Sequence, residues 1–111
     1  MSNRLIFAVS CVLGLSGLAA CQSPGPDAGR GAMMYRATCA TCHEPGSSPQ
    51  GPNLTELAAM NGGQFPMDRV TRIIDGRAGL RAHGSAMPVW GAFLTPPEVR
   101  DLAAYVASIQ Q

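Results

Sequence analysis

Two thiols and an imidazole stand close together in one segment, Cys39-Ala40-Thr41-Cys42-His43. In a helix, Cys39 and Cys42 lie about one turn apart on the same side. Two thiols at this spacing can each bond one vinyl group of a haem while the adjoining imidazole meets the iron, and C-x-x-C-H is the attachment signal of haem c. The motif therefore predicts one covalently bound haem, attached through Cys39 and Cys42, with His43 as an axial ligand of the iron.

Two other uses of the cysteine pair compete with haem attachment. A thioredoxin-like redox pair is expected among alternating strands and helices, and the sequence has no such alternation. A structural zinc site needs two more well-spaced ligands, for which only His83 and the acidic residues are available. The export signal described next and the scarcity of aromatic residues favour haem, because a domain this small needs a cofactor or cross-link to supplement its core.

The chain begins with a segment typical of exported proteins. Residues 1–20 carry one charge, Arg4, followed by an uncharged and largely apolar run, which predicts a signal peptide. The last three residues of this run and the next residue read Leu-Ala-Ala-Cys, ending at Cys21. This segment resembles the lipobox of bacterial lipoproteins, which implies that Cys21 is acylated as the first residue of the mature protein. The alternative is an ordinary signal peptide followed by an incidental cysteine.

The residues after the signal peptide predict a tether. Segment 21–27 is rich in Pro, Gly and Ser, so we expect a lipidated spacer that holds the following domain, residues 28–111, away from the lipid surface. Position 22 is Gln, whereas Asp there resembles a retention signal for the inner membrane, so the outer membrane is favoured. The expected location is the bacterial cell envelope, with the lipid-anchored domain facing the periplasm.

The numbers of cysteines and of charged residues exclude further possibilities for disulfide bonding and for function. Of the 4 Cys, Cys11 leaves with the signal peptide and Cys21 takes the lipid, so no disulfide partner remains for the pair in the motif. The chain has 8 basic and 7 acidic residues, for a formal net charge of +1. This balance excludes nucleic-acid binding by bulk charge.

Beyond the motif, the chain resembles the class I c-type cytochromes over about residues 27–111. Gly31 and Tyr35 precede the motif like the Gly and the aromatic residue of the first helix in that family. The Gly-Pro turn of the family follows the motif and ends here at Pro52, whose carbonyl is implied to accept a hydrogen bond from the ligating imidazole of His43. The resemblance implies an all-α cytochrome c fold, with about three to five short helices wrapped around one haem.

Local signals predict the first and last helices of this domain. Asp27 is suited to cap a helix over residues 28–38. Thr95 and Glu98 form a capping box with Pro at the first helical position, and apolar residues at helical spacing continue the pattern over 96–110. We therefore expect a long terminal helix with an apolar face.

Two shorter helices are expected between them, over 55–60 and 67–75, the second ending at Gly76. The family resemblance implies that the first and last helices cross at Gly31 and Tyr105. We expect apolar side chains of the two short helices and the residue before them to cover the haem: Leu54, Leu57, Val70, Ile73 and Ile74.

A second axial ligand must come from downstream residues, where Met and His are the usual choices. Met87 stands in the segment Ala-Met-Pro-Val-Trp, which resembles the axial-Met segment of the family, and the Pro after it favours the extended backbone that such a loop needs. His83 lies four residues away and is the alternative ligand. Met60 and Met67 are interpreted as fillers of the core.

Other polar side chains could bind the haem propionates. Trp90 could donate its indole N–H, and an arginine could pair with a propionate. Spacing does not distinguish the candidate arginines, which are Arg69, Arg72, Arg77 and Arg81.

Together these residues predict electron transfer. With His43 and Met87 as ligands, the iron has no open position, so chemistry on O₂ or a substrate is disfavoured and the chain is not expected to be an enzyme. We expect a monomeric, membrane-tethered one-electron carrier between periplasmic redox proteins. The alternative is a permanent electron-transfer subunit of a periplasmic dehydrogenase, reductase or oxidase complex. A haem sensor or enzyme would instead need a labile sixth ligand.

Overall fold

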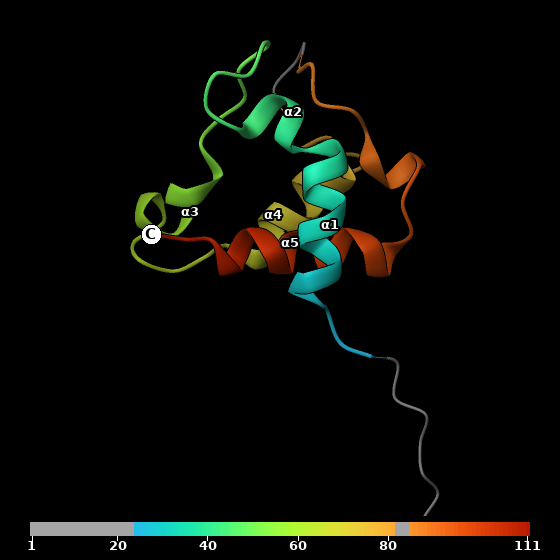
Figure 1. Ribbon diagram of the computed structural model, residues 1–111. Helices are drawn as coiled ribbons and strands as arrows, with labels where there is room; N and C mark the ends of the chain where they lie inside the picture. Colours follow the sequence, from blue (N-terminus) through green and yellow to red (C-terminus); the bar gives the residue numbers. More distant parts are fainter. Residues whose placement is uncertain (1–23, 82–84) are drawn as a thin grey trace, which may run out of the picture.

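The computed structural model describes residues 24–81 and 85–111. All regular structure in these two stretches is helical, so the predicted all-α class is confirmed. No helix in them is both long enough and apolar enough to cross a lipid bilayer. The elements in chain order, with η for a 3₁₀ turn, are α1 (Ala28–Thr38), α2 (Ala40–His43), η1 (Leu54–Glu56), α3 (Leu57–Met60), α4 (Met67–Asp75), η2 (Trp90–Ala92) and α5 (Pro96–Ser108). Figure 1 shows α1 and α5 crossing near the centre.

Helix α1 begins and ends where the sequence predicts. The carboxylate of Asp27 accepts a hydrogen bond from the backbone N–H of Arg30 at 2.8 Å, which satisfies one of the donors that a first helical turn leaves unpaired. The backbone N–H of Asp27 donates to Asp101 Oδ1 at 2.7 Å. The last residue of the expected spacer is therefore bonded to α5 as well as to α1.

The crossing of α1 and α5 depends on Gly31. A Cβ at this position would overlap the backbone carbonyl of Asp101 and the side chain of Tyr105, so only a glycine lets the two helices approach this closely. The rings of Tyr35 and Tyr105 lie beside the crossing, with centroids 5.0 Å apart. The crossing at Gly31 and Tyr105 that the family resemblance implies is present.

Helix α5 begins with the predicted capping box. The backbone N–H and the hydroxyl of Thr95 both donate to the Glu98 carboxylate, at 2.8 and 2.7 Å. The helix ends at Ser108 and not at residue 110. The side-chain amide of Gln110 donates to the Leu54 carbonyl at 2.6 Å, which draws the C-terminus towards η1 and α3 (Figure 1).

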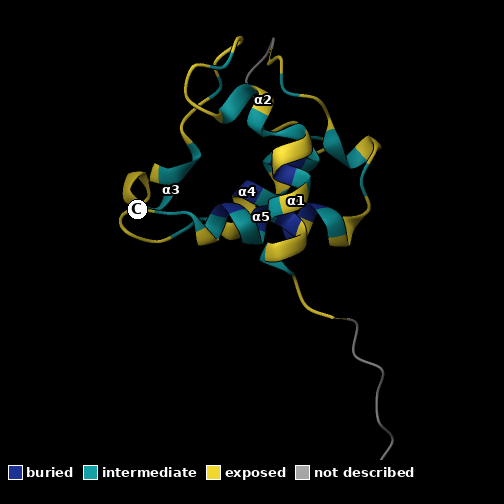
Figure 2. Ribbon diagram, viewed as in Figure 1, coloured by how far each residue is buried: buried dark blue, intermediate teal, exposed yellow. Residues whose placement is uncertain are grey.

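The core lies where α1, α4 and α5 meet, as the buried residues in Figure 2 show. The buried apolar side chains are Tyr35, Val70, Ile74, Val99, Leu102, Ala103 and Val106. Asp101 is buried among them at 3% exposure, and it is the one buried charged residue in the described stretches. The stripe predicted on the last helix therefore faces the core through Val99, Leu102 and Val106.

The two shorter helices differ in how closely they follow the sequence prediction. The segment expected as a helix over 55–60 is a 3₁₀ turn followed by α3, and the Asn53 side chain caps its start by accepting from the Thr55 backbone N–H at 3.0 Å. Helix α4 has its predicted bounds. It ends at Gly76, whose φ of 76° is the left-handed conformation that glycine favours.

The interpretation of Met60 and Met67 as core fillers is wrong. Met60 is 78% exposed and Met67 is 41% exposed. Met60 is the last residue of the short α3, and Met67 is the first residue of α4. Neither position belongs to the helix faces that meet in the core.

Candidate functional site

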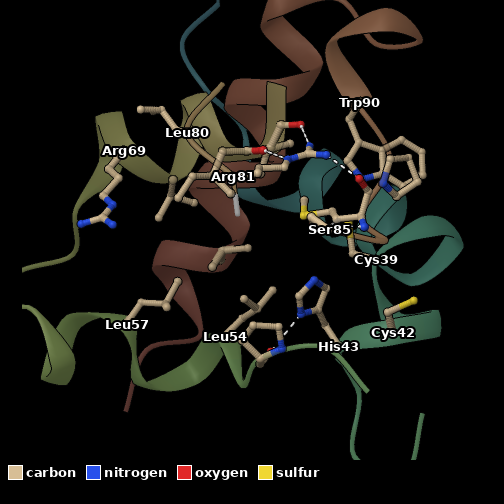
Figure 3. Close-up of a pocket in the computed structure, with 18 of the residues that line it drawn as sticks. Cys39, Cys42, His43, Leu54, Leu57, Arg69, Leu80, Arg81, Ser85 and Trp90 are labelled. Atoms are coloured by element: carbon tan, nitrogen blue, oxygen red, sulfur yellow. Dashed lines mark hydrogen bonds between the residues drawn. The ribbon is translucent and has the colours of Figure 1, made fainter. Parts of the chain in front are cut away.

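A cavity of about 630 Å³ lies between α2, the η1 and α3 segment, α4 and residues 85–90. A volume of this order is typical of sites for organic ligands and cofactors. The predicted site residues in the described chain all line it: Cys39, Cys42, His43, Pro52, Met87 and Trp90. Figure 3 shows several of them around the cavity. Cys21 and His83 lie outside the described residues.

The cysteine motif is carried on a single helical turn. The backbone N–H of Cys39 donates to the Tyr35 carbonyl at 2.9 Å, so α2 follows α1 without an intervening loop. The N–H groups of Cys42 and His43 both donate to the Cys39 carbonyl, at 3.1 and 3.0 Å. This turn sets both cysteines and the imidazole at the same cavity.

The surroundings of the two thiols bear on the rival uses of the cysteine pair. Both thiols are free. Burial raises the pKa of the Cys39 thiol, against the opposing effect of a hydrogen bond with Thr38, whereas redox-active pairs lower the pKa of a cysteine to form a reactive thiolate. The described residues also contain no strand, so the alternating strands and helices expected around a thioredoxin-like pair are absent from them. Within 24–81 and 85–111, no group of three or more His, Cys, Asp or Glu gathers to hold a metal ion.

The imidazole of His43 is oriented by the turn at Pro52. His43 Nδ1 lies 2.9 Å from the Pro52 carbonyl oxygen, and because a carbonyl only accepts, this contact favours the tautomer with the proton on Nδ1. The lone pair is then on Nε2, the nitrogen available to a metal. A Cβ on Gly51 would lie 2.8 Å from Nδ1, so the glycine of the Gly-Pro turn is needed to let the chain pass this close to the ring.

The remaining walls of the cavity are mainly apolar. Side chains from η1, α3, α4 and α5 form them: Leu54, Leu57, Val70, Ile73, Ile74 and Val106. The two short helical segments that the sequence predicts to cover a haem thus face the cavity. Val70, Ile74 and Val106 also belong to the buried core, so the cavity wall is backed by the packing of α4 on α5.

The four candidate arginines are in different environments. Arg77 forms an ion pair with Asp75 at 2.7 Å, and its hydrogen bonds lower the pKa of that carboxyl to about 2. Arg72 Nε donates to the Asp68 carbonyl of its own helix at 3.4 Å. Arg69 lines the cavity with an exposed side chain (Figure 3). Of these three, Arg69 is best located for a carboxylate bound in the cavity.

The fourth candidate, Arg81, has a role that the sequence analysis missed. Its guanidinium donates to the backbone carbonyls of Ile73, Ile74 and Met87. The signal that could have revealed it is an arginine shortly after a helix end, because the last carbonyls of a helix have no partners within it.

A comparison with known protein families shows to which family the chain with this cavity belongs. Residues 26–106 match the family model described as "Cytochrome C oxidase, cbb3-type, subunit III". The chain belongs to this family of c-type cytochromes. As a c-type cytochrome it carries haem c, bound covalently and containing iron. The resemblance to class I cytochromes noted in the sequence is thereby confirmed.

The cytochrome is also similar to individual curated proteins. Three of them are each described as "Cbb3-type cytochrome c oxidase subunit FixP". It is 38% identical over 104 residues to the protein from Azorhizobium caulinodans, covering 88% of this chain and 32% of that relative. For Sinorhizobium medicae the identity is 36% over 86 residues, covering 73% and 29% of the two chains. For Bradyrhizobium sp. it is 32% over 112 residues, covering 96% and 35%. The chain thus spans about a third of the length of these relatives. No solved structure matches it.

Proposed function

We propose that this cytochrome transfers single electrons through a haem fastened to Cys39 and Cys42, with His43 and Met87 as the two axial ligands. The observation that carries the proposal is the convergence of these four side chains on one cavity with apolar walls. When bound there, haem c supplies a one-electron couple at its iron.

The residues of the cavity fit this group. Two cysteines on one helical turn are available for thioether bonds, and His43 has its Nδ1 engaged with Pro52 at 2.9 Å, which leaves Nε2 for the iron. Met87 is half-buried and packs against the core cluster, so its sulfur is a neutral, soft ligand in apolar surroundings. The apolar walls exclude water from the iron and help to stabilise its less charged form.

The presence of two protein ligands on the iron also argues against catalysis by this chain. His43 and Met87 together leave no coordination position for O₂ or a substrate, so catalysis at the iron is disfavoured in this chain. The protein acts by holding the redox centre in one coordination state, which keeps the structural change on electron transfer small.

We further propose that the electron partner is an oxidase complex to which the cytochrome belongs as a subunit. The relatives described above are subunits of cbb3-type cytochrome c oxidases, and this supports a permanent oxidase subunit over the membrane-tethered carrier that the sequence alone favours. A lipid on Cys21 would hold the domain at the membrane of the cell envelope, on the periplasmic side.

The axial ligands are tested by replacing Met87 with Ala in the haem-loaded protein. The wild type should have the weak red-region absorption of a ferric iron–sulfur bond and bind little carbon monoxide. Met87→Ala should lose the band and bind the gas readily. If the wild type lacks the band, and His83→Ala but not Met87→Ala opens the iron to carbon monoxide, the ligand pair is bis-histidine. A wild type that binds carbon monoxide rapidly would point to a sensor or enzyme.

The partner is tested by gentle detergent extraction of membranes that contain the native protein. A subunit should co-migrate with haem-stained partner chains and oxidase activity through affinity purification and a native gel. Recovery of all the cytochrome as a free monomer, while the oxidase activity runs elsewhere on the gel, would support the carrier and overturn the subunit proposal.

A further inference from the structure

The guanidinium of Arg81 joins two parts of the chain that meet at the cavity. Its Nε donates to the Ile73 carbonyl at 2.8 Å, and one of its terminal nitrogens donates to the Ile74 carbonyl at 2.9 Å. The other terminal nitrogen donates to the Met87 carbonyl. One side chain therefore ties the backbone of Met87 to the C-terminal end of α4, as the dashed lines around Arg81 in Figure 3 indicate.

The end of α4 is suited to hold such a cation. Ile73 and Ile74 belong to the last turn, where helix carbonyls have no partner within the helix and the helix dipole attracts positive charge. Burial lowers the pKa of Arg81, against the opposing effect of Asp75. An arginine keeps its charge under these conditions, and its planar fork can serve three acceptors in fixed directions, which the compact ammonium of a lysine cannot do.

Gly76 provides the space for this side chain. A Cβ on Gly76 would lie 2.6 Å from a terminal nitrogen of Arg81 and 2.7 Å from the central guanidinium carbon. The residue also has a φ of 76°. Gly79 has a similar φ of 66°, but no atom lies within 4 Å of its virtual Cβ. The two glycines thus differ in whether a methyl group would displace the guanidinium.

A second attachment holds the segment after Met87 to the same helix end. A Cβ on Gly91, in η2, would lie 2.6 Å from the carboxylate of Asp75 and 2.7 Å from Arg77 Nε. The Asp75 and Arg77 ion pair therefore packs directly on the backbone of η2. The chain is therefore held at the end of α4 twice, by the hydrogen bond from Arg81 to the Met87 carbonyl and by the packing at Gly91 four residues later.

We propose that Arg81 is a positioning residue that keeps Met87 at the iron by tying its carbonyl to the end of α4. The proposal rests on the proposed role of Met87 as an axial ligand. Because Arg81 bonds the backbone of Met87 and not its sulfur, it increases the fraction of molecules in which Met87 is bound to the iron. It does not change the chemistry of the iron–sulfur bond.

The test measures how readily an added ligand replaces Met87. Imidazole titrated into the ferric, haem-loaded protein binds only when Met87 has left, so its apparent affinity is proportional to the open fraction. Removing a charge-assisted hydrogen bond to the Met87 carbonyl should increase that fraction about tenfold. We expect Arg81→Met to bind imidazole about tenfold more tightly than the wild type. Arg81→Lys should resemble Arg81→Met, because it keeps the charge but not the fork.

The glycine pair supplies a test that leaves Arg81 itself unchanged. Gly76→Ala should displace the guanidinium and tighten imidazole binding, whereas Gly79→Ala introduces the same left-handed alanine without the clash and should bind imidazole like the wild type. This comparison also decides the matter if Arg81→Met fails to fold. On heating, Arg81→Lys and Gly76→Ala should lose the red band well before the helical circular dichroism, a separation that a general loss of stability would not produce.

The outcomes separate this proposal from the one on which it rests. If the wild type has no red band, Met87 is not the ligand and the proposed function fails at that point. If the band is present and is lost in Met87→Ala, but the Arg81 and Gly76 variants bind imidazole like the wild type, the axial ligand stands and the positioning role is overturned. If Arg81→Lys alone matches the wild type, charge is sufficient and the three-carbonyl bridge is not the cause.

Discussion

Gly31 of α1 lies directly on the backbone of Asp101 in α5. A Cβ on Gly31 would be 2.0 Å from the Asp101 carbonyl oxygen, 2.6 Å from its carbonyl carbon and 2.9 Å from Tyr105 Cβ. Two of these three contacts are with backbone atoms, which cannot move aside as a flexible side chain can. The distance between the two helices is therefore set by the absence of a side chain at residue 31.

Gly31→Ala should destabilise the protein strongly. The methyl group must push α1 away from α5, which disturbs the packing of Tyr35 on Tyr105, and overpacking of this kind costs about 1 to 3 kcal/mol or more. We expect a lower melting temperature of the haem-loaded protein, measured by circular dichroism at the helix band.

Gly29→Ala is the matched control for Gly31→Ala. Gly29 is exposed in the same helix, and its added Cβ would meet only the Asp27 side-chain oxygen, at 3.1 Å. Alanine at an exposed helix position gains about 0.5 to 1 kcal/mol over glycine. A Gly31→Ala protein as stable as Gly29→Ala would contradict the close helix crossing.

The buried Asp101 should make stability depend on pH at the acid end. Its carboxylate accepts from Arg30 Nε at 2.8 Å and from the backbone N–H of Asp27 at 2.7 Å, and these hydrogen bonds, led by that of Arg30, lower the pKa of Asp101 against the effect of burial. The side chain of an unfolded Asp has a pKa of about 4. The pKa of Asp101 is lower in the folded protein. Its stabilising effect is therefore complete above about pH 4 and is lost as the pH falls through the pKa of the folded state.

Asp101→Asn should therefore be less stable than the wild type at neutral pH, by about 1 to 2 kcal/mol. The difference should shrink as the pH is lowered below about 4, where the wild-type carboxylate also takes up a proton. Denaturant unfolding at several pH values measures this, and a double-mutant cycle with Arg30→Gln assigns the coupling to the pair. A difference that stays constant down to acid pH would show that the charge of Asp101 is not what stabilises the fold.

Much of the helical structure follows from local signals. The bounds of α1 and α4 and the start of α5 agree with caps at Asp27, Gly76 and Thr95, because a cap acts within one or two turns of its helix. The end of α5 differs because Gln110 bonds Leu54, a residue far away in sequence. No pattern within the last helix contains that contact.

The functional site also combines features that the local sequence predicts with features that depend on the tertiary structure. The thiol spacing is local, and it was sufficient to predict that Cys39, Cys42 and His43 belong together. The place of Pro52 beside His43 was implied by the resemblance to class I cytochromes and not by spacing. The task of Arg81 was not predictable from spacing, because it depends on where α4 ends in space relative to Met87. The exposure of Met60 was missed for a similar reason, since one helical turn does not determine which side faces the core.

Cys39→Ser and Cys42→Ser should each weaken covalent haem attachment, and the double variant should abolish it. Each serine removes one possible thioether bond and leaves the helical turn intact. Denaturing gels stained for haem peroxidase activity measure attachment, since only covalently bound haem stays with the chain. Cys21→Ser, which changes a cysteine outside the motif, is the control and should keep the stain. A wild-type band without stain would contradict haem attachment at the motif.

Arg69→Gln should lower the reduction potential. A cation near a haem propionate stabilises the reduced form, which carries one positive charge fewer than the oxidised form, so its removal favours oxidation. We expect a decrease on the order of 30 to 60 mV, where about 59 mV corresponds to a tenfold change for one electron. Arg72→Gln is the control, because Arg72 has the same charge on the same helix but does not line the cavity. Equal shifts in the two variants would point to general surface charge and not to a propionate partner.

Cys21 is predicted to tether the chain to the membrane. If Cys21 carries the lipid, the wild type should partition into the detergent phase after phase separation. A protein with Cys21→Ser and a non-lipoprotein signal peptide should be recovered in the aqueous phase with its haem still attached, because the substitution removes the acylated residue and the haem motif begins beyond the spacer. Mass spectrometry of the mature N-terminus identifies the acyl chains directly. A wild-type protein found without acyl chains and with its leader still attached would mean that an uncleaved leader, and not a lipid, anchors the chain.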